Sequence, residues 1–196
     1  MPGESAHHKL APLFRLQELE KLQKPKIEPR HAAVMAVFYP DPQHQVHFVL
    51  ILRPTYRGVH SNQVAFPGGR VEKEDRDLAH TALRETEEEV GIPQEDVEVL
   101  KEMTPIYIGP SNFWVRPYIG ILGYTPELVP QPEEVESIIE VDLEDFLSDT
   151  SMTIQRLNTS YSKSIEVPAF LLSGHVVWGA TAMMLNEMKD ILKEVL

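Results

Sequence analysis

The chain contains no cysteine, and this absence excludes several kinds of chemistry. Without a thiol the protein can form neither a disulfide nor a thiolate metal site, and it has no cysteine nucleophile. The absence is compatible with a reducing compartment, and we expect a cytoplasmic protein. The first residues, MPGESAHHKLAPLF, lack the basic region and apolar run of a secretory signal, so we expect none.

Basic residues and long apolar runs are also scarce. The chain has 18 Lys and Arg against 30 Asp and Glu, which gives a formal net charge of −12 at pH 7. This balance argues against general binding to nucleic acid or to an anionic membrane. No stretch approaches the roughly 20 consecutive apolar residues of a membrane-spanning helix. A phosphorylated small molecule remains a suitable partner, because a bound divalent cation and a few arginines can reverse the local charge.

The length fits one sizeable domain, or a domain with a terminal extension. The chain has 196 residues, and 42% of them are hydrophobic, which is enough for a packed core. Apolar spacing predicts a helix over residues 10–22, followed by a proline-containing connector over residues 23–30. We therefore expect residues 1–30 to form an N-terminal helical extension and residues 31–196 to form the main domain.

The main domain shows strand patterns that flank helix patterns. Pro117 lies inside a predicted strand and indicates that this strand is at a sheet edge or contains a bulge. Strands that flank helices, with connections of mixed length, predict an α/β/α sandwich around a mixed β-sheet. The predicted strands are residues 32–39, 47–53, 97–107 with a break at Thr104 and Pro105, 113–122, 135–141 and 165–172; the predicted helices are residues 77–90, 143–147 and 176–196, and residues 151–164 are expected to be a loop or a hairpin.

The most informative segment is residues 66–92, in which a diglycine turn precedes an acidic helical pattern. Glu85, Glu88 and Glu89 lie at i, i+3 and i+4, so they share one flank of the predicted helix. Carboxylates this close repel one another, and the usual reason to gather them is a hard divalent cation that takes oxygen ligands. The alternative is a solvated acidic helix face. The ordered combination of turn, acids and terminal glycine favours a site for Mg²⁺ or Mn²⁺.

The phase of this helix separates the three acids. At about 100° per residue, Glu85 and Glu89 lie beside the apolar face, whereas Glu88 lies further round, nearly opposite the core. Arg84 is four residues before Glu88 and can hold a carboxylate by charge-assisted hydrogen bonding. Gly91 follows the last helical residue, where a left-handed cap is expected.

Residues 84–92 resemble the second half of the Nudix box, G-x5-E-x7-R-E-U-x-E-E-x-G-U with U apolar, except that Thr86 takes the place of the first U. The first half departs from the pattern, and Gly69 and Asp75 supply it only if one extra residue is allowed. An insertion in the loop before a helix costs little free energy. The same insertion is typical of the coenzyme A pyrophosphatase branch of the Nudix family.

The resemblance to this branch covers most of residues 32–190. Residues 51–69, ILRPTYRGVHSNQVAFPGG, are similar to its upstream pattern, although Gly58 replaces a basic residue. Residues 110–118, PSNFWVRPY, and residues 177–182, VWGATA, are similar to two of its later segments. The resemblance implies the Nudix fold, metal-dependent hydrolysis of a diphosphate linkage in a small nucleoside diphosphate derivative, and possible homodimers, since many Nudix proteins dimerise.

The resemblance also assigns roles to individual residues. It implies a metal site made by Glu85, Glu88, Glu89 and the backbone carbonyl of Gly68, and it implies Glu88, Glu85 and Arg84 as the catalytic set. Family members place the general base either in the box or on a later loop. Glu88 is the candidate in the box, and the candidates after the proline-rich loop are Glu133, Glu134 and Glu136.

Arginines near the diglycine turn are the candidates for binding phosphate. Arg53, Arg57 and Arg70 cluster there in the sequence, although Arg57 could equally be a surface charge. His60 lies in the same stretch, and we expect it to be structural. Trp114 and Phe113 alternate on a predicted strand, so one of them faces outward.

The expected substrate is coenzyme A or a derivative, cleaved to 4′-phosphopantetheine and adenosine 3′,5′-bisphosphate. Two alternatives stay open. The first is a Nudix hydrolase of another substrate, such as ADP-ribose, a dinucleotide or a nucleoside triphosphate. The second is a non-catalytic Nudix-fold binding module. It is disfavoured because such modules usually lose acids from the box, whereas Glu85, Glu88 and Glu89 are all present here with Arg84.

Overall fold

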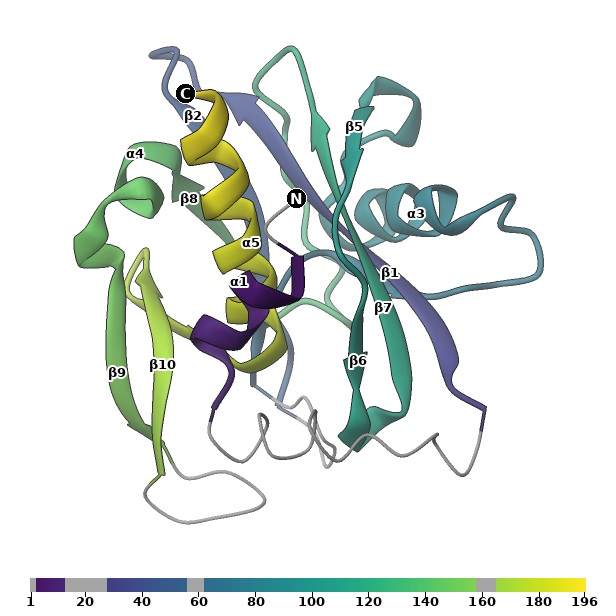
Figure 1. The fold of residues 1–196 in the computed structure, drawn as a ribbon. Helices are drawn as coiled ribbons and strands as arrows, with labels where there is room; N and C mark the ends of the chain where they lie inside the picture. Colours follow the sequence, from purple (N-terminus) through teal and green to yellow (C-terminus); the bar gives the residue numbers. More distant parts are fainter. Residues whose placement is uncertain (1–2, 13–27, 56–61, 158–164) are drawn as a thin grey trace.

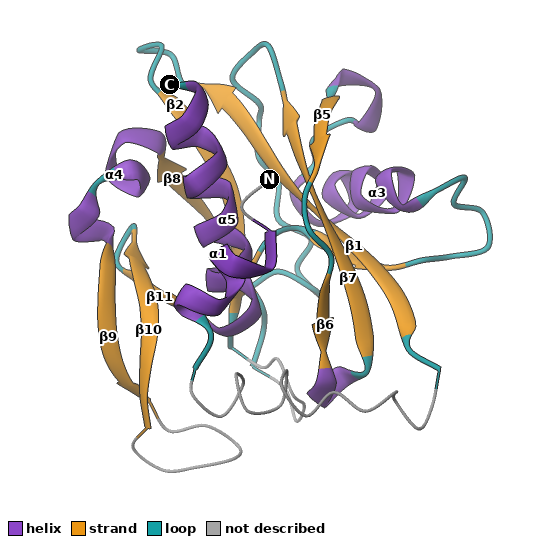
Figure 2. Ribbon diagram, in the orientation of Figure 1, coloured by secondary structure: helices purple, strands orange, loops and turns teal. Residues whose placement is uncertain are grey.

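The fold was taken from a computed structural model, which describes residues 3–12, 28–55, 62–157 and 165–196 (Figure 1). A mixed β-sheet forms the centre. Helix α3 (Leu78–Val90) covers one face, and α5 (Gly179–Val195) with α1 (Gly3–Leu10) covers the other (Figure 2). This arrangement confirms the predicted α/β/α sandwich. The strands of the sheet are β1 (Arg30–Pro40), β2 (Val46–Leu52), β3 (Val64–Ala65), β4 (Gly68–Arg70), β5 (Glu98–Glu102), β6 (Ile106–Ile108), β7 (Phe113–Ile121) and β8 (Ser137–Asp142).

The sheet runs in the order β3-β2-β1-β7-β5, with β4 beside β1, β6 beside β7, and β8 beside β2. Strands β1 and β7 are parallel, and the other pairs are antiparallel. Strand β1 is buried on both faces, as expected for a central strand. Ala33 and Met35 pack in the cluster on the α3 side, and Ala36 and Phe38 pack in the cluster on the α5 side.

Pro117 does not mark a sheet edge, because β7 lies inside the sheet, but the pairing of β5 with β7 does contain a register shift, between Val99 and Lys101. Strand β1 pairs with β7 on one side, while β5 and β6 pair with it on the other. Tyr118 is opposite Glu102 at the end of β5, and Val115 is opposite Ile106 at the start of β6. The neighbouring chain is therefore interrupted opposite Pro117, where a missing N–H costs no ladder hydrogen bond on that side.

The C-terminal part forms a second sheet in the order β11-β10-β9, made by β9 (Met152–Leu157), β10 (Ile165–Leu172) and β11 (His175–Trp178). Residues 151–164 are predicted to be a loop or a hairpin, and the described part of this segment contains strand β9, which pairs antiparallel with β10 as in a hairpin. The long helix begins at Gly179 and not at Val176. Ser173 and Gly174 have positive φ and turn the chain back, so residues after the turn pair with β10 before the helix starts. Helix α4 (Leu143–Leu147) lies where the sequence predicted it.

The N-terminal segment packs on the core of the domain. Helix α1 lies against α5, and Leu10 and Ala11 belong to the main hydrophobic cluster. The helix predicted over residues 10–22 lies outside the described residues from residue 13 onward, and the boundary at residue 30 stays a prediction. Among the described helices, none is long and apolar enough to span a membrane.

Candidate metal centre

Helix α3 carries the acidic residues, and its two ends are fixed by local capping. The side chain of Asp77 accepts a hydrogen bond of 2.7 Å from the backbone N–H of His80. At the other end Gly91 has φ +78°, and its N–H donates to the carbonyl of Glu87. The caps define the start and the end of the helix.

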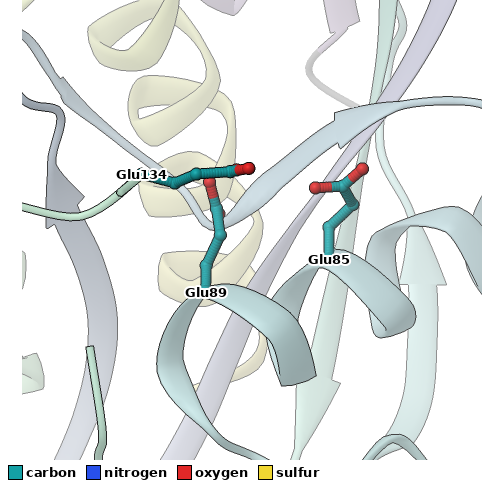
Figure 3. Close-up of side chains that lie close together, drawn as sticks. All are labelled: Glu85, Glu89 and Glu134. Atoms are coloured by element: carbon teal, nitrogen blue, oxygen red, sulfur yellow. The ribbon is translucent and has the colours of Figure 1, made fainter. Parts of the chain in front are cut away.

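Three glutamates come together at the C-terminal half of α3 (Figure 3). Glu85 and Glu89 rise from consecutive turns of the helix, and Glu134 reaches them from the loop before β8. One carboxylate oxygen from each of the three lies within 4.8 Å of the others. Glu89 is only 1% exposed, Glu85 is partly buried, and Glu134 is exposed. The group therefore has a buried side and a side open to solvent.

Backbone hydrogen bonds bring the loop of Glu134 to the helix. The N–H of Val129 donates to the carbonyl of Val90 over 3.0 Å, and the N–H of Gln131 donates to the carbonyl of Glu89 over 3.1 Å. These two carbonyls belong to the last turn of α3 and have no partner within the helix. The loop is thus held by the helix end that carries Glu89.

The diglycine of β4 passes directly beside these acids. Gly68 has φ +150°, and a Cβ there would lie 2.3 Å from the carbonyl oxygen of Ala33. Its N–H donates a 2.8 Å hydrogen bond to Oε2 of Glu89. A Cβ on Gly69 would lie 2.4 Å from Cδ of Glu85 and 2.5 Å from both carboxylate oxygens. Both positions require glycine for close approach, and they place the backbone against two of the three carboxylates.

Burial makes the group electrostatically unfavourable without a cation. It raises the pKa of Glu89 to about 8, only partly opposed by the N–H of Gly68 and the charge of Arg53, while the nearby Glu85 and Glu134 raise it further. Burial also raises the pKa of Glu85, against the attraction of Arg84. An all-oxygen, negatively charged group with a buried side is the kind of site that Mg²⁺ or Mn²⁺ occupies. The donor set therefore fits a divalent cation held by Glu85, Glu89 and Glu134.

Arg84 connects the acids of the helix to the preceding loop. Its Nε donates to Oδ1 of Asp75 over 3.0 Å, and its two terminal nitrogens donate to Glu88 at 2.8 Å and Glu85 at 3.0 Å. It also donates to the carbonyl of Arg70 over 3.2 Å. These contacts orient the Glu85 carboxylate, so Arg84 acts here as a positioning residue.

Asp75 anchors this arginine. Its side chain is fully buried and also accepts hydrogen bonds from the hydroxyl of Thr81 and the N–H of Glu72. The hydrogen bond from Arg84 holds the pKa of Asp75 well below its usual range. Asp75, which matches the motif only if one extra residue is allowed, therefore still contacts Arg84, the arginine of that motif.

Glu88 lies apart from the three clustered glutamates. Its side chain is 56% exposed, and its Oε2 accepts from Arg84. Relative to Glu85, Glu89 is rotated about 40° in one direction and Glu88 about 60° in the other, so the two diverge. The structure does not bring Glu88 into the group, and its predicted roles as ligand and base remain predictions. The sequence indicates Glu134 only as a candidate base, because its approach to the helix depends on the loop and not on helix spacing.

The predicted substrate-binding arginines differ in position. Arg53 follows β2, its charge acts on Glu89, and its Nε is buried without a hydrogen-bond partner among the described residues. Arg70 is exposed at the end of β4. Arg57 and His60 lie outside the described residues. Among the predicted substrate-binding arginines, Arg53 is therefore the one that the described structure places near the acids with a donor that has no described partner.

Comparisons with known proteins identify the family. The model of the NUDIX domain matches residues 29–160. The chain belongs to the Nudix hydrolase family. This Nudix hydrolase is 33% identical over 162 residues to the Nudix hydrolase NudL of Photorhabdus laumondii, covering 81% of this chain and 83% of that protein. It is 30% identical over 176 residues to Nudix hydrolase 15, mitochondrial, of Arabidopsis thaliana, covering 86% of this chain and 61% of that one.

A solved structure supports the fold. A Nudix hydrolase from M. smegmatis, RenU, superposes with a TM-score of 0.57 at 17% identity and covers 86% of this Nudix hydrolase and 88% of that chain. Together with the family match, these likenesses show a Nudix-fold hydrolase of a diphosphate-containing substrate. Helices α1 and α5 both lie outside the matched residues 29–160.

Proposed function

We propose that this Nudix hydrolase cleaves the diphosphate of coenzyme A or its derivatives, yielding 4′-phosphopantetheine and adenosine 3′,5′-bisphosphate, with Mg²⁺ or Mn²⁺ as cofactor. The observation that carries the hydrolytic part is the Glu85–Glu89–Glu134 group beside Gly68 and Gly69. A divalent cation in such a site neutralises phosphate oxygens and acidifies a bound water.

The remaining roles follow from the contacts of the protein. Glu85 and Glu89 hold the ion from the buried side, and Arg84 keeps the Glu85 carboxylate in place. We assign Arg53 to a phosphate oxygen next to these acids, because its charge acts on Glu89 and its buried Nε has no hydrogen-bond partner among the described residues. Glu134 faces solvent, and we propose that one of its oxygens completes the ligand set while the other takes the proton of the attacking water. Glu88 is less suited to be the base, because its Oε2 is already bonded to Arg84.

The choice of coenzyme A rests on three segments that resemble the coenzyme A pyrophosphatase branch. Two of them meet in the fold: the hydroxyl of Thr181 in the WGATA segment donates a 3.0 Å hydrogen bond to the carbonyl of Val64 in the VAFPGG segment. Their contact supports a shared role, since segments far apart in the sequence converge on the strand that leads to the diglycine. A homodimer rests on the resemblance alone and stays a prediction.

A substrate panel tests the proposal. Coenzyme A, its dephospho form, ADP-ribose and diadenosine polyphosphates would be compared with Mg²⁺ and with Mn²⁺, and products identified by mass spectrometry. We expect the highest kcat/KM with coenzyme A or its dephospho form, and no turnover after the metal is removed by chelation. A preference for ADP-ribose would overturn the choice of coenzyme A, and turnover without metal would overturn the role of the acidic group.

A further inference from the structure

Gln131 organises the turn that carries Glu134. Its side-chain Oε1 accepts two backbone hydrogen bonds, from the N–H of Glu133 at 2.6 Å and from the N–H of Glu134 at 3.0 Å. Its own carbonyl accepts from the N–H of Glu134 at 3.1 Å and of Val135 at 2.8 Å. The turn is thus closed by both the main chain and the side chain of one residue, in the manner of a helix N-cap.

The same residue also fastens the turn to α3. The N–H of Gln131 donates to the carbonyl of Glu89, one of the two buried-side members of the acidic group. Just beyond the turn, Val135 is buried in the cluster on the α3 side, and the N–H of Glu136 donates to the carbonyl of Leu52. Gln131 therefore joins the backbone of Glu89 to the backbone of Glu134, whose carboxylates lie close together.

This arrangement matters because Glu134 is the exposed member of the group. Glu89 is held by its burial, and Glu85 is held by Arg84. Among the described residues, the Glu134 carboxylate has no hydrogen-bond or ion-pair partner, and its position depends on the turn beneath it. An exposed carboxylate on a loose turn would also move away from Glu85 and Glu89 wherever these are ionised, since like charges repel.

We propose that Gln131 is a positioning residue that holds Glu134 against Glu85 and Glu89 through the acceptor oxygen of its side chain. The proposal rests on the proposed function of Glu134 in metal binding and hydrolysis.

Two substitutions separate the acceptor from the bulk of the side chain. Gln131→Met keeps a similar length and removes the oxygen, whereas Gln131→Asn keeps an amide oxygen of the kind that caps such turns. Gln94→Met is the matched control. The side chain of Gln94 donates a 2.8 Å hydrogen bond to Glu87 of α3, away from the acidic group. Each variant would be assayed for kcat and KM with the best substrate of the panel, for Mn²⁺ affinity by calorimetry without substrate, and for thermal stability.

We expect Gln131→Met to lower kcat about tenfold, which corresponds to about 1.4 kcal/mol, and to weaken Mn²⁺ binding, with little change in KM. Gln131→Asn should stay within about threefold of the wild type, a factor below 1 kcal/mol, and Gln94→Met should not differ from it. In a Glu134→Gln background, Gln131→Met should cause no further fall, because its effect acts through Glu134.

Equal activity of Gln131→Met and the wild type would overturn the proposal. So would equal losses in the Met and Asn variants together with a lower melting temperature, or a further loss in the Glu134→Gln background. If the wild type hydrolyses no coenzyme A but Mn²⁺ binding still depends on Gln131 as described, the proposed substrate fails and the positioning role stands.

Discussion

Two glutamates of this protein are equally buried but differ in the hydrogen bonds that their carboxylates accept. Glu89 on α3 is 1% exposed, and Glu187 on α5 is 0% exposed. Glu187 accepts hydrogen bonds from Nε2 of His7 at 2.9 Å and from the hydroxyl of Thr104 at 2.6 Å, as well as from the Thr104 N–H. For Glu89, the described structure shows one hydrogen bond to the carboxylate, from Gly68.

The two pKa values move in opposite directions because of these partners. Burial opposes ionisation of Glu187, but the hydrogen bonds from His7 and Thr104 outweigh it and lower its pKa. For Glu89 burial dominates, and two neighbouring carboxylates add to it. A buried acid whose charge is already compensated ties the fold together, whereas a buried acid whose charge is not compensated indicates a site that needs a cation.

The largest expected effect is a loss of kcat on substitution of Glu89. Glu89→Gln removes a proposed metal ligand and should lower kcat by about a thousandfold, on the scale of a lost electrostatic contact in a transition state. Because the amide carries no buried charge, the folded protein should melt at the same temperature as the wild type or higher when no metal is present. The measurement is kcat with saturating Mn²⁺ together with thermal melts in chelator. Wild-type activity in this variant would end the assignment of Glu89.

The next largest effect is expected at Glu134, the third member of the acidic group. Glu134→Gln should lower kcat about a hundredfold, whereas Glu88→Gln should lower it about tenfold or less, because Glu88 acts on Glu85 only through Arg84. Titration of activity with Mn²⁺ in both variants checks this order. The reverse order would return Glu88 to the ligand set that the helix spacing first suggested.

The pH dependence of stability without metal tests the raised pKa of Glu89. A glutamate in the unfolded chain has a pKa near 4.3. In the folded protein, burial raises the pKa of Glu89 to about 8. Between these values the folded state binds the extra proton. Its free energy of unfolding should therefore fall as the pH rises, by on the order of a few kcal/mol across this window. Denaturant melts in chelator at several pH values measure the slope.

Metal and mutation provide the controls for that slope. Mg²⁺ competes with the proton, so it should restore most stability at the alkaline end of the window. In Glu89→Gln the slope should largely disappear. A slope that persists unchanged in this variant would have to come from another group.

Much of the acidic site could be predicted because its signals are local. Asp77 and Gly91 cap α3 as residue types at helix ends do, and the helical phase correctly placed Glu88 outward and Glu85 and Glu89 beside the core. The approach of Glu134 could not be predicted. It depends on hydrogen bonds between a loop and the last turn of a helix, which leave no periodic pattern in the sequence.

The C-terminal helix α5 shows where local sequence patterns fail to predict burial. Glu187 and Lys189 fit the polar side of an amphipathic pattern, but both are buried, at 0% and 3% exposure. Helix α1 contributes His7 to Glu187, and the turn after α4 contributes the Ser148 carbonyl to Lys189 over 2.7 Å. No local pattern distinguishes a polar residue that faces solvent from one that another element covers. For the same reason the packing of α1 on α5 was not predicted.

A stability effect without a catalytic one is expected for the compensated acid. Glu187→Gln weakens the bonds to His7 and Thr104 and should cost about 2 kcal/mol of unfolding free energy at neutral pH. The lowered pKa means that the stabilisation by ionised Glu187 is present above the unfolded value near 4.3 and is lost as the pH falls below it. Denaturant melts at neutral and acid pH measure both. A fall in kcat at full occupancy of the folded state would show that this pair reaches the active site.

The smallest effect is expected where the same two helices meet at the surface. Lys9 donates to Asp190 over 2.9 Å, but the two side chains are 61% and 30% exposed. Exposed ion pairs contribute little because water and salt screen them, so Lys9→Ala should change the unfolding free energy by less than about 0.5 kcal/mol. Paired melts of Lys9→Ala and Glu187→Gln at low and high salt measure the difference. A loss in Lys9→Ala as large as that in Glu187→Gln would mean that surface charge, and not the buried His7–Glu187 bond, holds α1 on α5.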